Sequence, residues 1–293
     1  MEIIIAKNSG LCYGVKRALK IATETRNTKS GKVYTLGDLV HNPQIIADLK
    51  HNDISSVEKL EELMEGTIII RSHGISPEIY NQLTQKKLGV VDATCPIVKK
   101  IQRLVESLTK SKNEIIIVGN KDHPEIKGLI GYSQGKAIII ENELQAKNLP
   151  QKKKRAVLAQ STQDLFLFEK VVLALLERTK ELKVFNTICK STQTRQKSTS
   201  ELASCVDSLI IIGGKNSSNT NKLYEISKRI LPRTYFIESA EQITSEMLEG
   251  VQKIGLSGGA STPPEAIQEA VHIIKTRFMH KVKGRNEFNV RVN

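Results

Sequence analysis

The cysteines are the residues of this chain that are best suited to metal or redox chemistry. The sequence holds four: Cys12, Cys95, Cys189 and Cys205. They are too few and too widely spaced for a disulfide framework, and no Cys-x-x-Cys pair provides the local spacing typical of zinc sites. Cys12, Cys95 and Cys189 each follow an expected strand. Three thiolates that meet from separate strand ends suit a metal cluster with one metal incompletely ligated by protein, although a buried structural role is the alternative for each.

Cys205 follows no strand and has neighbours of a different kind. It lies in the segment 201–206, whose residues favour a helix. A lone cysteine in a helix is most often a small buried hydrophobic residue, so we expect Cys205 to lie in the core.

Three histidines repeat the pattern of the three cysteines. His41, His73 and His123 each lie beside Gly or Pro close to an expected strand end. One such histidine is commonly structural, whereas three favour a convergent site. Their imidazoles could donate hydrogen bonds to an anion or bind a metal.

Glu125 follows His123-Pro124 at an expected helix start. The positive end of the helix dipole would lower the pKa of this carboxyl group, which is the ordinary role of an acidic residue there. A diphosphate and an anionic cluster nearby would raise the pKa again. Only in that second setting could Glu125 donate a proton at neutral pH.

Two loops rich in Gly and Ser connect expected strands to expected helices, at 213–219 and 257–261. Backbone N–H groups and the helix dipole bind phosphate in this geometry. Helix capping is the compatible alternative, since Thr262 to Glu265 resembles a capping box and Asn216 or Ser218 could cap the helix after the first loop. Ser261 precedes the expected cap and is therefore freer to contact a ligand.

The elements that must position these residues alternate along the chain. Eleven short β-branched runs, unalternated as in strands covered on both faces, are separated by segments with apolar residues at helical spacing. This pattern predicts an α/β fold with largely parallel sheets. The chain divides into three similar stretches, so we expect three modules at residues 1–96, 97–190 and 191–280, followed by a charged, frayed tail at 281–293.

Composition narrows the function classes. The chain has 293 residues, a net charge of +13, 4% aromatic residues and no Trp. The basic charge suits polyanions, but the scarcity of aromatic residues disfavours nucleic-acid binding and favours a solvated basic surface. No apolar run is long enough to cross a membrane, and the first residues resemble a strand rather than a targeting peptide, which predicts a cytoplasmic protein without membrane association.

Taken together, these motifs resemble the 4-hydroxy-3-methylbut-2-enyl diphosphate reductase family over about residues 1–275. The resemblance rests on the following pieces, all as they stand in this sequence: Gly-Leu-Cys12-Tyr-Gly-Val, Val-His41-Asn-Pro, Ser-His73-Gly, Asp-Ala-Thr-Cys95-Pro, Gly-Asn-Lys-Asp-His123-Pro-Glu125, Ile-Cys189 followed by Ser-Thr-x-x-Arg-Gln, and Lys-Asn-Ser217-Ser218-Asn219. It implies three α/β modules arranged around a central iron–sulfur cluster. It also implies reductive dehydroxylation of an allylic diphosphate to isopentenyl and dimethylallyl diphosphate, the last step of the non-mevalonate isoprenoid pathway.

The resemblance also assigns roles to residues. Cys12, Cys95 and Cys189 would ligate a [4Fe–4S] cluster whose open fourth iron binds the substrate hydroxyl, and Glu125 would donate protons. The substrate-binding set would be His41, His73, His123, Ser161, Thr162, Ser217, Ser218, Asn219 and Ser261. An acidic electron carrier such as flavodoxin or ferredoxin would be the partner. A non-catalytic basic binding module and a structural zinc protein are the alternatives.

Two positions depart from the family pattern. The family commonly has Gln-Thr-Thr where this chain has Gln160-Ser161-Thr162, so the hydroxyl that contacts the substrate alcohol is expected to come from Ser161. Serine lacks the β-methyl group and is less fixed at χ1, which loosens that contact without changing its chemistry. Leu11 replaces a common aromatic residue, which changes packing alone.

Overall fold

Parallel strand pairing organises the whole chain. The computed structural model describes residues 1–86, 88–111, 113–278 and 290–292, which form three sheets of five, four and four strands. Every strand pair within them is parallel. Parallel sheets must be covered on both faces, and the apolar Ile and Val runs of the strands provide two apolar faces. The predicted fold class, three α/β modules with parallel sheets, is confirmed.

The chain divides into two compact units. Unit 1 comprises Met1–Cys12, His41–Ile45 and Lys190–Asn293, and unit 2 comprises Tyr13–Val40 and Ile46–Cys189. Unit 1 contains the five-stranded sheet and unit 2 contains both four-stranded sheets.

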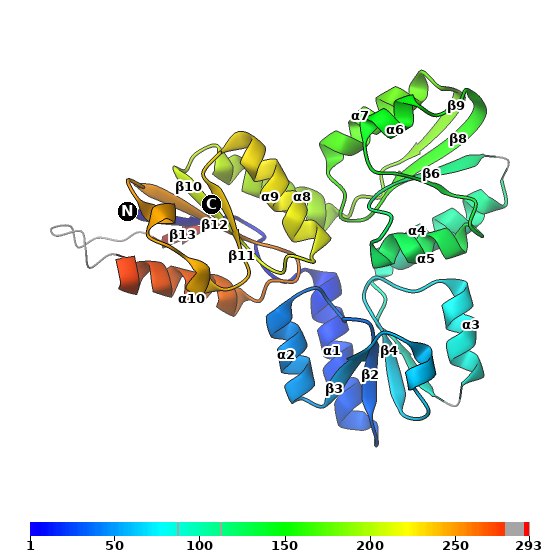
Figure 1. Cartoon of the computed structure of the whole chain (residues 1–293), viewed down its shortest axis with the longest axis horizontal. Helices are drawn as coiled ribbons and strands as arrows, with labels where there is room; N and C mark the ends of the chain where they lie inside the picture. The colour runs from blue at the N-terminus through cyan, green and yellow to red at the C-terminus, as the bar shows by residue number, and fades with distance from the viewer. Residues whose placement is uncertain (87, 112, 279–289, 293) are drawn as a thin grey trace. The chain divides into compact units, whose positions relative to one another are not determined.

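The sheet of unit 1 has the order β11-β10-β12-β1-β13. Its strands are β1 (Glu2–Ile5), β10 (Ser208–Ile212), β11 (Thr234–Ile237), β12 (Lys253–Gly258) and β13 (Val290–Val292). Helices α8 (Lys190–Ala203) and α9 (Ser218–Ile230) pack on one face, and α10 (Pro264–Ile273) packs on the other (Figure 1). Short helical turns complete the unit at η2 (Ala240–Gln242), η3 (Glu246–Leu248) and η4 (Ile274–Phe278).

The first sheet of unit 2 has the order β3-β2-β4-β5. Its strands are β2 (Val33–Leu36), β3 (Ile54–Val57), β4 (Thr67–Ile70) and β5 (Gly89–Asp92). Its helices are α1 (Tyr13–Thr28), α2 (Pro43–His51), η1 (Leu60–Glu62) and α3 (Pro77–Gln85). Ala18 and Ala22 of α1 pack on one face of the sheet, and Leu83 of α3 packs on the other.

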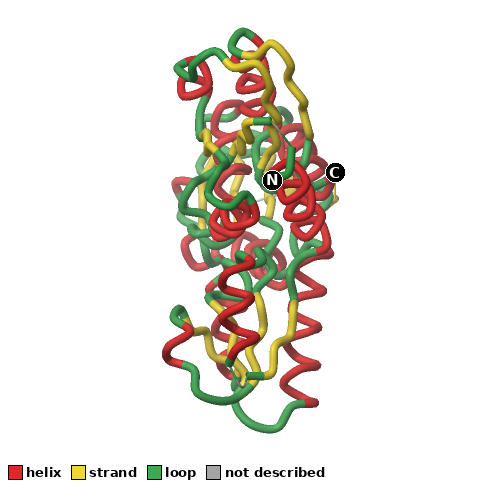
Figure 2. Tube along the Cα trace, turned by 90° about the vertical axis from the view of Figure 1, so that its right-hand side faces the viewer, coloured by secondary structure: helices red, strands yellow, loops and turns green. Residues whose placement is uncertain are grey.

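The second sheet of unit 2 has the order β7-β6-β8-β9. Its strands are β6 (Glu114–Val118), β7 (Ile138–Ile140), β8 (Lys152–Ala159) and β9 (Thr179–Phe185). Its helices are α4 (Pro96–Thr109), α5 (Pro124–Tyr132), α6 (Glu143–Lys147) and α7 (Leu165–Leu176). Helices α4 and α5 cover one face, while α6 and α7 cover the other. Figure 2 shows how helices, strands and loops alternate along the chain.

All eleven predicted strands are present, and two further strands were not predicted. β3 has the sequence Ile-Ser-Ser-Val, whose two central residues are exposed, and β13 lies in the expected tail. The rest of that tail, residues 281–289 and 293, lies outside the described residues. The domain boundaries 1–96, 97–190 and 191–280 stay a prediction. One sheet, however, combines strands from both ends of the chain, because β1 pairs with β12 and β13.

Among the described residues, no helix combines the length and the apolar character that crossing a bilayer would require.

Buried Arg155 holds together one end of the second sheet in unit 2. Its side chain is fully buried and contacts Glu114 Oε2 at 2.7 Å, the carbonyl oxygens of Pro150 and Arg178 at 2.7 and 2.8 Å, and Thr179 Oγ1 at 3.1 Å. Its neighbour Lys154 pairs with Glu181 at the surface.

We predict that Arg155→Met lowers the free energy of unfolding by about 3 kcal/mol or more, because it leaves a carboxylate and several acceptors without their buried donor. Lys154→Met is the matched control, with an expected loss of less than about 1 kcal/mol for an exposed pair. Denaturant unfolding measures both values. Equal losses in the two variants would contradict the prediction.

Candidate active site

Cys95 and Cys189 lie in loops of the same construction within unit 2. Asp92 Oδ1 accepts a hydrogen bond from Thr94 N at 2.8 Å, and Asn186 Oδ1 accepts one from Ile188 N at 3.2 Å. In each loop, therefore, an Asp or Asn three residues before the cysteine turns the chain at the end of a strand. Both cysteines are half-buried, and neither forms a disulfide bond with a described residue. The repeated Asx turn is a signal that the sequence reading did not use.

Each of these cysteines is fixed through its backbone to a neighbouring loop. Cys95 N donates to Ser72 O at 2.9 Å, and Cys189 N donates to Ser161 O, also at 2.9 Å. Thr187 adds a second link for the latter loop, because its hydroxyl bonds with both the N–H and the carbonyl of Ala159. The two thiols are therefore held on the loops that carry His73 and Ser161.

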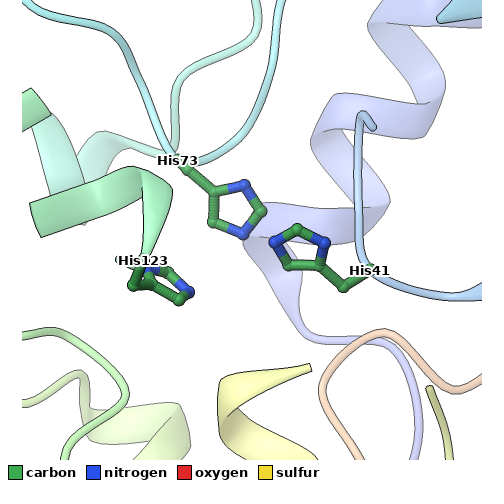
Figure 3. A group of neighbouring side chains, drawn as sticks. All are labelled: His41, His73 and His123. Carbon is green, nitrogen blue, oxygen red and sulfur yellow. The ribbon is translucent and has the colours of Figure 1, made fainter. Parts of the chain in front are cut away.

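His123 is the N-cap of α5. Its Nδ1 accepts from Glu125 N at 3.1 Å, so this nitrogen carries no proton and Nε2 is left as the donor of the ring. Pro124 occupies the first helical position, where its fixed φ suits the helix start. The ring of His73 meets the ring of His123 edge to face with centroids 5.2 Å apart (Figure 3). Unit 2 thus brings two of the three predicted histidines together.

Glu125 is bound at both carboxyl oxygens by one residue. Ser161 N donates to Oε1 at 2.7 Å and Ser161 Oγ donates to Oε2 at 2.5 Å, and the Glu125 side chain is 2% exposed. Burial raises the pKa of Glu125 above its ordinary value, while the two hydrogen bonds from Ser161 lower it in part. Burial is the larger of these effects, so the surroundings of Glu125 favour the protonated form of its carboxyl group.

Gln160 joins the loop before α5, the helix that carries Glu125, to the segment of Ser161 and Thr162. The sequence did not reveal this role. Gln160 Oε1 accepts from Asn120 N at 3.0 Å, and its Nε2 donates to Thr162 Oγ1 at 2.8 Å. Gly119 is packed so closely against this side chain that an added Cβ would collide with it. The hydroxyl of Thr162 therefore has a structural partner, whereas that of Ser161 faces the carboxyl group.

The start of α9 forms a second polar group, within unit 1. Ser217 is the N-cap, and its Oγ accepts from Thr220 N, in place of the expected Asn216 or Ser218. Ser218 and Asn219 begin the helix. Both polar atoms of the Asn219 amide are buried and have no hydrogen-bond partner among the described residues. A buried amide of this kind at a helix N-terminus suits an anion that supplies the missing partner.

His41 and Ser261 lie beside this helix start in the same unit. Ser261 Oγ donates to His41 O at 3.1 Å, and the same carbonyl oxygen is packed against Gly214. Thr262 does not form the expected capping box. Pro263 is the N-cap of α10 without a side-chain hydrogen bond, and Thr262 Oγ1 donates to Ile212 O instead at 2.7 Å. The serine before it is free of capping, as expected.

The two remaining cysteines, Cys12 and Cys205, differ in burial. Cys12 is half-buried and its N–H donates to Ala260 O at 3.0 Å in unit 1. The expectation that Cys205 is buried was wrong, since α8 ends at Ala203 and Cys205 lies exposed in the following turn. Its thiol donates to Leu202 O at 3.3 Å, one turn back in the chain.

The sequence as a whole matches known proteins. Residues 3–275 match the sequence model of the family described as LytB protein. The chain belongs to the LytB family. A LytB relative from Geobacter metallireducens, named 4-hydroxy-3-methylbut-2-enyl diphosphate reductase, is 43% identical over 94% of this chain and 97% of its own length.

Two solved structures agree with this membership. One, of (E)-4-hydroxy-3-methyl-but-2-enyl diphosphate reductase, described as the terminal enzyme of the non-mevalonate pathway, is 44% identical, with a TM-score of 0.69 over 94% of this LytB chain and 99% of that one. The other, of the E-1-hydroxy-2-methyl-but-2-enyl-4-diphosphate reductase from Plasmodium falciparum, is 26% identical, with a TM-score of 0.90 over 100% and 92%.

Proposed function

We propose that this LytB protein is a 4-hydroxy-3-methylbut-2-enyl diphosphate reductase. The observation that carries the proposal is the 43% identity with a reductase of that name over nearly the full length of both chains. In the reaction the allylic C–O bond breaks and a C–H bond forms. Two electrons and two protons enter, the hydroxyl leaves as water, and isopentenyl or dimethylallyl diphosphate remains.

Cys12, Cys95 and Cys189 are the proposed ligands of a [4Fe–4S] cluster. Their chemistry fits this group, since each is a half-buried cysteine outside any disulfide bond and is fixed by its own backbone N–H, and thiolates are the usual ligands of iron–sulfur clusters. When bound, such a cluster supplies electrons one at a time and an iron that can act as a Lewis acid on the substrate oxygen. Cys205, exposed and outside these loops, has no part in the proposal.

Glu125 is the proposed proton donor. Its buried carboxyl group keeps a proton to a higher pH than an exposed one, because burial disfavours the charged form. The N–H and hydroxyl of Ser161 hold the carboxyl group in one orientation, and the same hydroxyl is the group proposed to contact the substrate alcohol. Thr162, bonded to Gln160, would support this segment.

The diphosphate is the proposed ligand of the histidine and hydroxyl groups. This set comprises His41, His73, His123, Ser217, Ser218, Asn219 and Ser261, and contains no Lys or Arg. The N-terminus of α9 would contribute its positive dipole and backbone N–H groups. The unpartnered, buried amide of Asn219 supports this role, because a bound phosphate oxygen would accept from its nitrogen.

The electron donor is proposed to be a small acidic protein such as flavodoxin or ferredoxin, in the cytoplasm. The net charge of +13 supports this choice, since complementary charge speeds the encounter of two proteins.

We predict that the cluster depends on three of the four cysteines. After anaerobic reconstitution, the wild type and Cys205→Ser should show the broad visible absorbance of thiolate-bound iron and about four iron and four sulfide per chain. Cys12→Ser, Cys95→Ser and Cys189→Ser should lose most of both. A colourless wild type, or an equal loss in Cys205→Ser, would contradict the ligand assignment.

We predict that Ser161→Ala moves the alkaline fall of kcat to higher pH. Turnover that needs protonated Glu125 falls as pH rises through the pKa of this group, and the Ser161 hydroxyl lowers that pKa. Removing the hydroxyl therefore raises the pKa, whereas Ser161→Thr keeps the hydroxyl and leaves the fall in place. Glu125→Gln should lower kcat roughly 10²–10⁴-fold. Identical pH profiles for the Ala and Thr variants would show that Ser161 does not act through Glu125.

We predict that turnover with an acidic protein donor falls steeply as salt is added, because screening weakens the attraction to a chain of charge +13. Turnover with a small uncharged chemical reductant is the control and should change little. If both rates respond to salt alike, electrostatic recruitment of the donor is excluded.

A further inference from the structure

Helix α8 reaches back to the loop that carries Cys12. Arg195 Nη2 donates to Gly10 O at 2.6 Å, and Ser198 Oγ donates to Lys7 O at 2.6 Å. All four residues belong to unit 1, and both donors lie on α8, which begins at the residue after Cys189. One helix thus fixes the loop of the first cysteine and directly follows the third in the chain.

The held loop has a conformation that needs support. Gly10 has φ +93°, in the left-handed region that residues other than glycine rarely adopt. A Cβ added at Gly10 would also lie 3.4 Å from Thr262 O. Two residues later, Cys12 N donates to Ala260 O at 3.0 Å. The loop is therefore fixed at Lys7 and Gly10 by α8 and at Cys12 by the loop that ends β12.

Arg195 is an unusual residue to hold the carbonyl of Gly10. Its side chain is 3% exposed, although a guanidinium group is costly to bury. The hydrogen bond to Gly10 O offsets part of this cost. Without Arg195 the buried carbonyl of Gly10 would lose a donor that is always charged. A neutral donor such as a serine hydroxyl or a side-chain amide could bind the same carbonyl at a lower desolvation cost. The hydrogen bond alone therefore does not explain why a charged residue is buried here.

We propose that Arg195 is a positioning residue for Cys12, which holds the Gly10–Cys12 segment and places a permanent positive charge next to it in unit 1. The proposal rests on the assignment of Cys12 as an iron ligand. Each electron that an iron–sulfur cluster accepts adds negative charge, which a nearby cation favours. Arg195 would therefore slow the loss of iron and raise the reduction potential.

Arg195→Gln and Lys197→Gln form the matched pair that tests this inference. Both remove one positive charge from α8, but Lys197 is exposed and pairs with Glu201 at the surface. Gln at position 195 can still donate a hydrogen bond, so its difference from wild type reports the reach and charge of Arg. Amide hydrogen exchange of residues 7–13, the rate of iron loss to a chelator and the midpoint potential are measured in both variants.

In Arg195→Gln we expect exchange of the 7–13 segment and iron loss to be about ten-fold faster than in wild type, and the midpoint potential to be more negative. In Lys197→Gln all three should equal wild type. If the Gln variant does not fold, Arg195→Lys is measured for exchange, which should also be faster, because an ammonium group is shorter and has fewer donors. Equal values for the variants at 195 and 197 would overturn the proposal.

Failure of the cluster assignment gives a different result. If wild-type protein binds no iron, the ligand proposal is wrong. The exchange measurement on the metal-free full chain then still decides whether Arg195 holds the loop, and unchanged exchange in Arg195→Gln overturns that.

Discussion

Parallel pairing is the constraint on which the rest of this molecule depends. A parallel strand cannot be joined to its neighbour by a tight turn, so the chain must leave each sheet at its carboxyl edge and return through a helix. The polar residues of the candidate site lie in those exits or in the first turn of the helix that follows. The same constraint supplies helix N-termini at the exits, as at His123 before α5 and Ser217 before α9, where backbone N–H groups are free to bind anions or side chains.

Within this frame, Ser161 connects the two kinds of chemistry in unit 2. Its side chain and N–H bind the carboxyl group of Glu125, while its carbonyl accepts from the backbone of Cys189. The position of an acid and the position of a thiol are thus fixed by one residue. Burial and hydrogen bonding act in opposite directions on the pKa of Glu125, so small changes at Ser161 should be felt in proton transfer rather than in folding.

Periodicity and composition could predict the strands, because fully covered strands need runs such as Ile68 to Ile70, which are apolar on both faces. They could not predict β3, whose exposed serines lack that signal, or the pairing of β1 with β12, because pairing between distant segments leaves no local trace in a sequence. The motifs placed the candidate site residues at or just after strand ends, which is where the structure has them. They did not show that Gln160, Thr187 and Arg195 hold these segments in place, because a hydrogen bond to a distant backbone atom has no pattern of its own.

The place of β1 in its sheet has a consequence for how the protein is made. This strand is made before the other described strands, yet its partner β12 begins 251 residues later. At ordinary rates of synthesis that interval is roughly 10–50 s. Unit 2 has all its strands by residue 185 and can fold meanwhile. The apolar segment Ile3 to Ile5 must wait for β12, and the loop of Cys12 acquires its partner Ala260 only after residue 260 has been made. Any cofactor that needs this loop in its final form therefore enters only after residue 260 has been made.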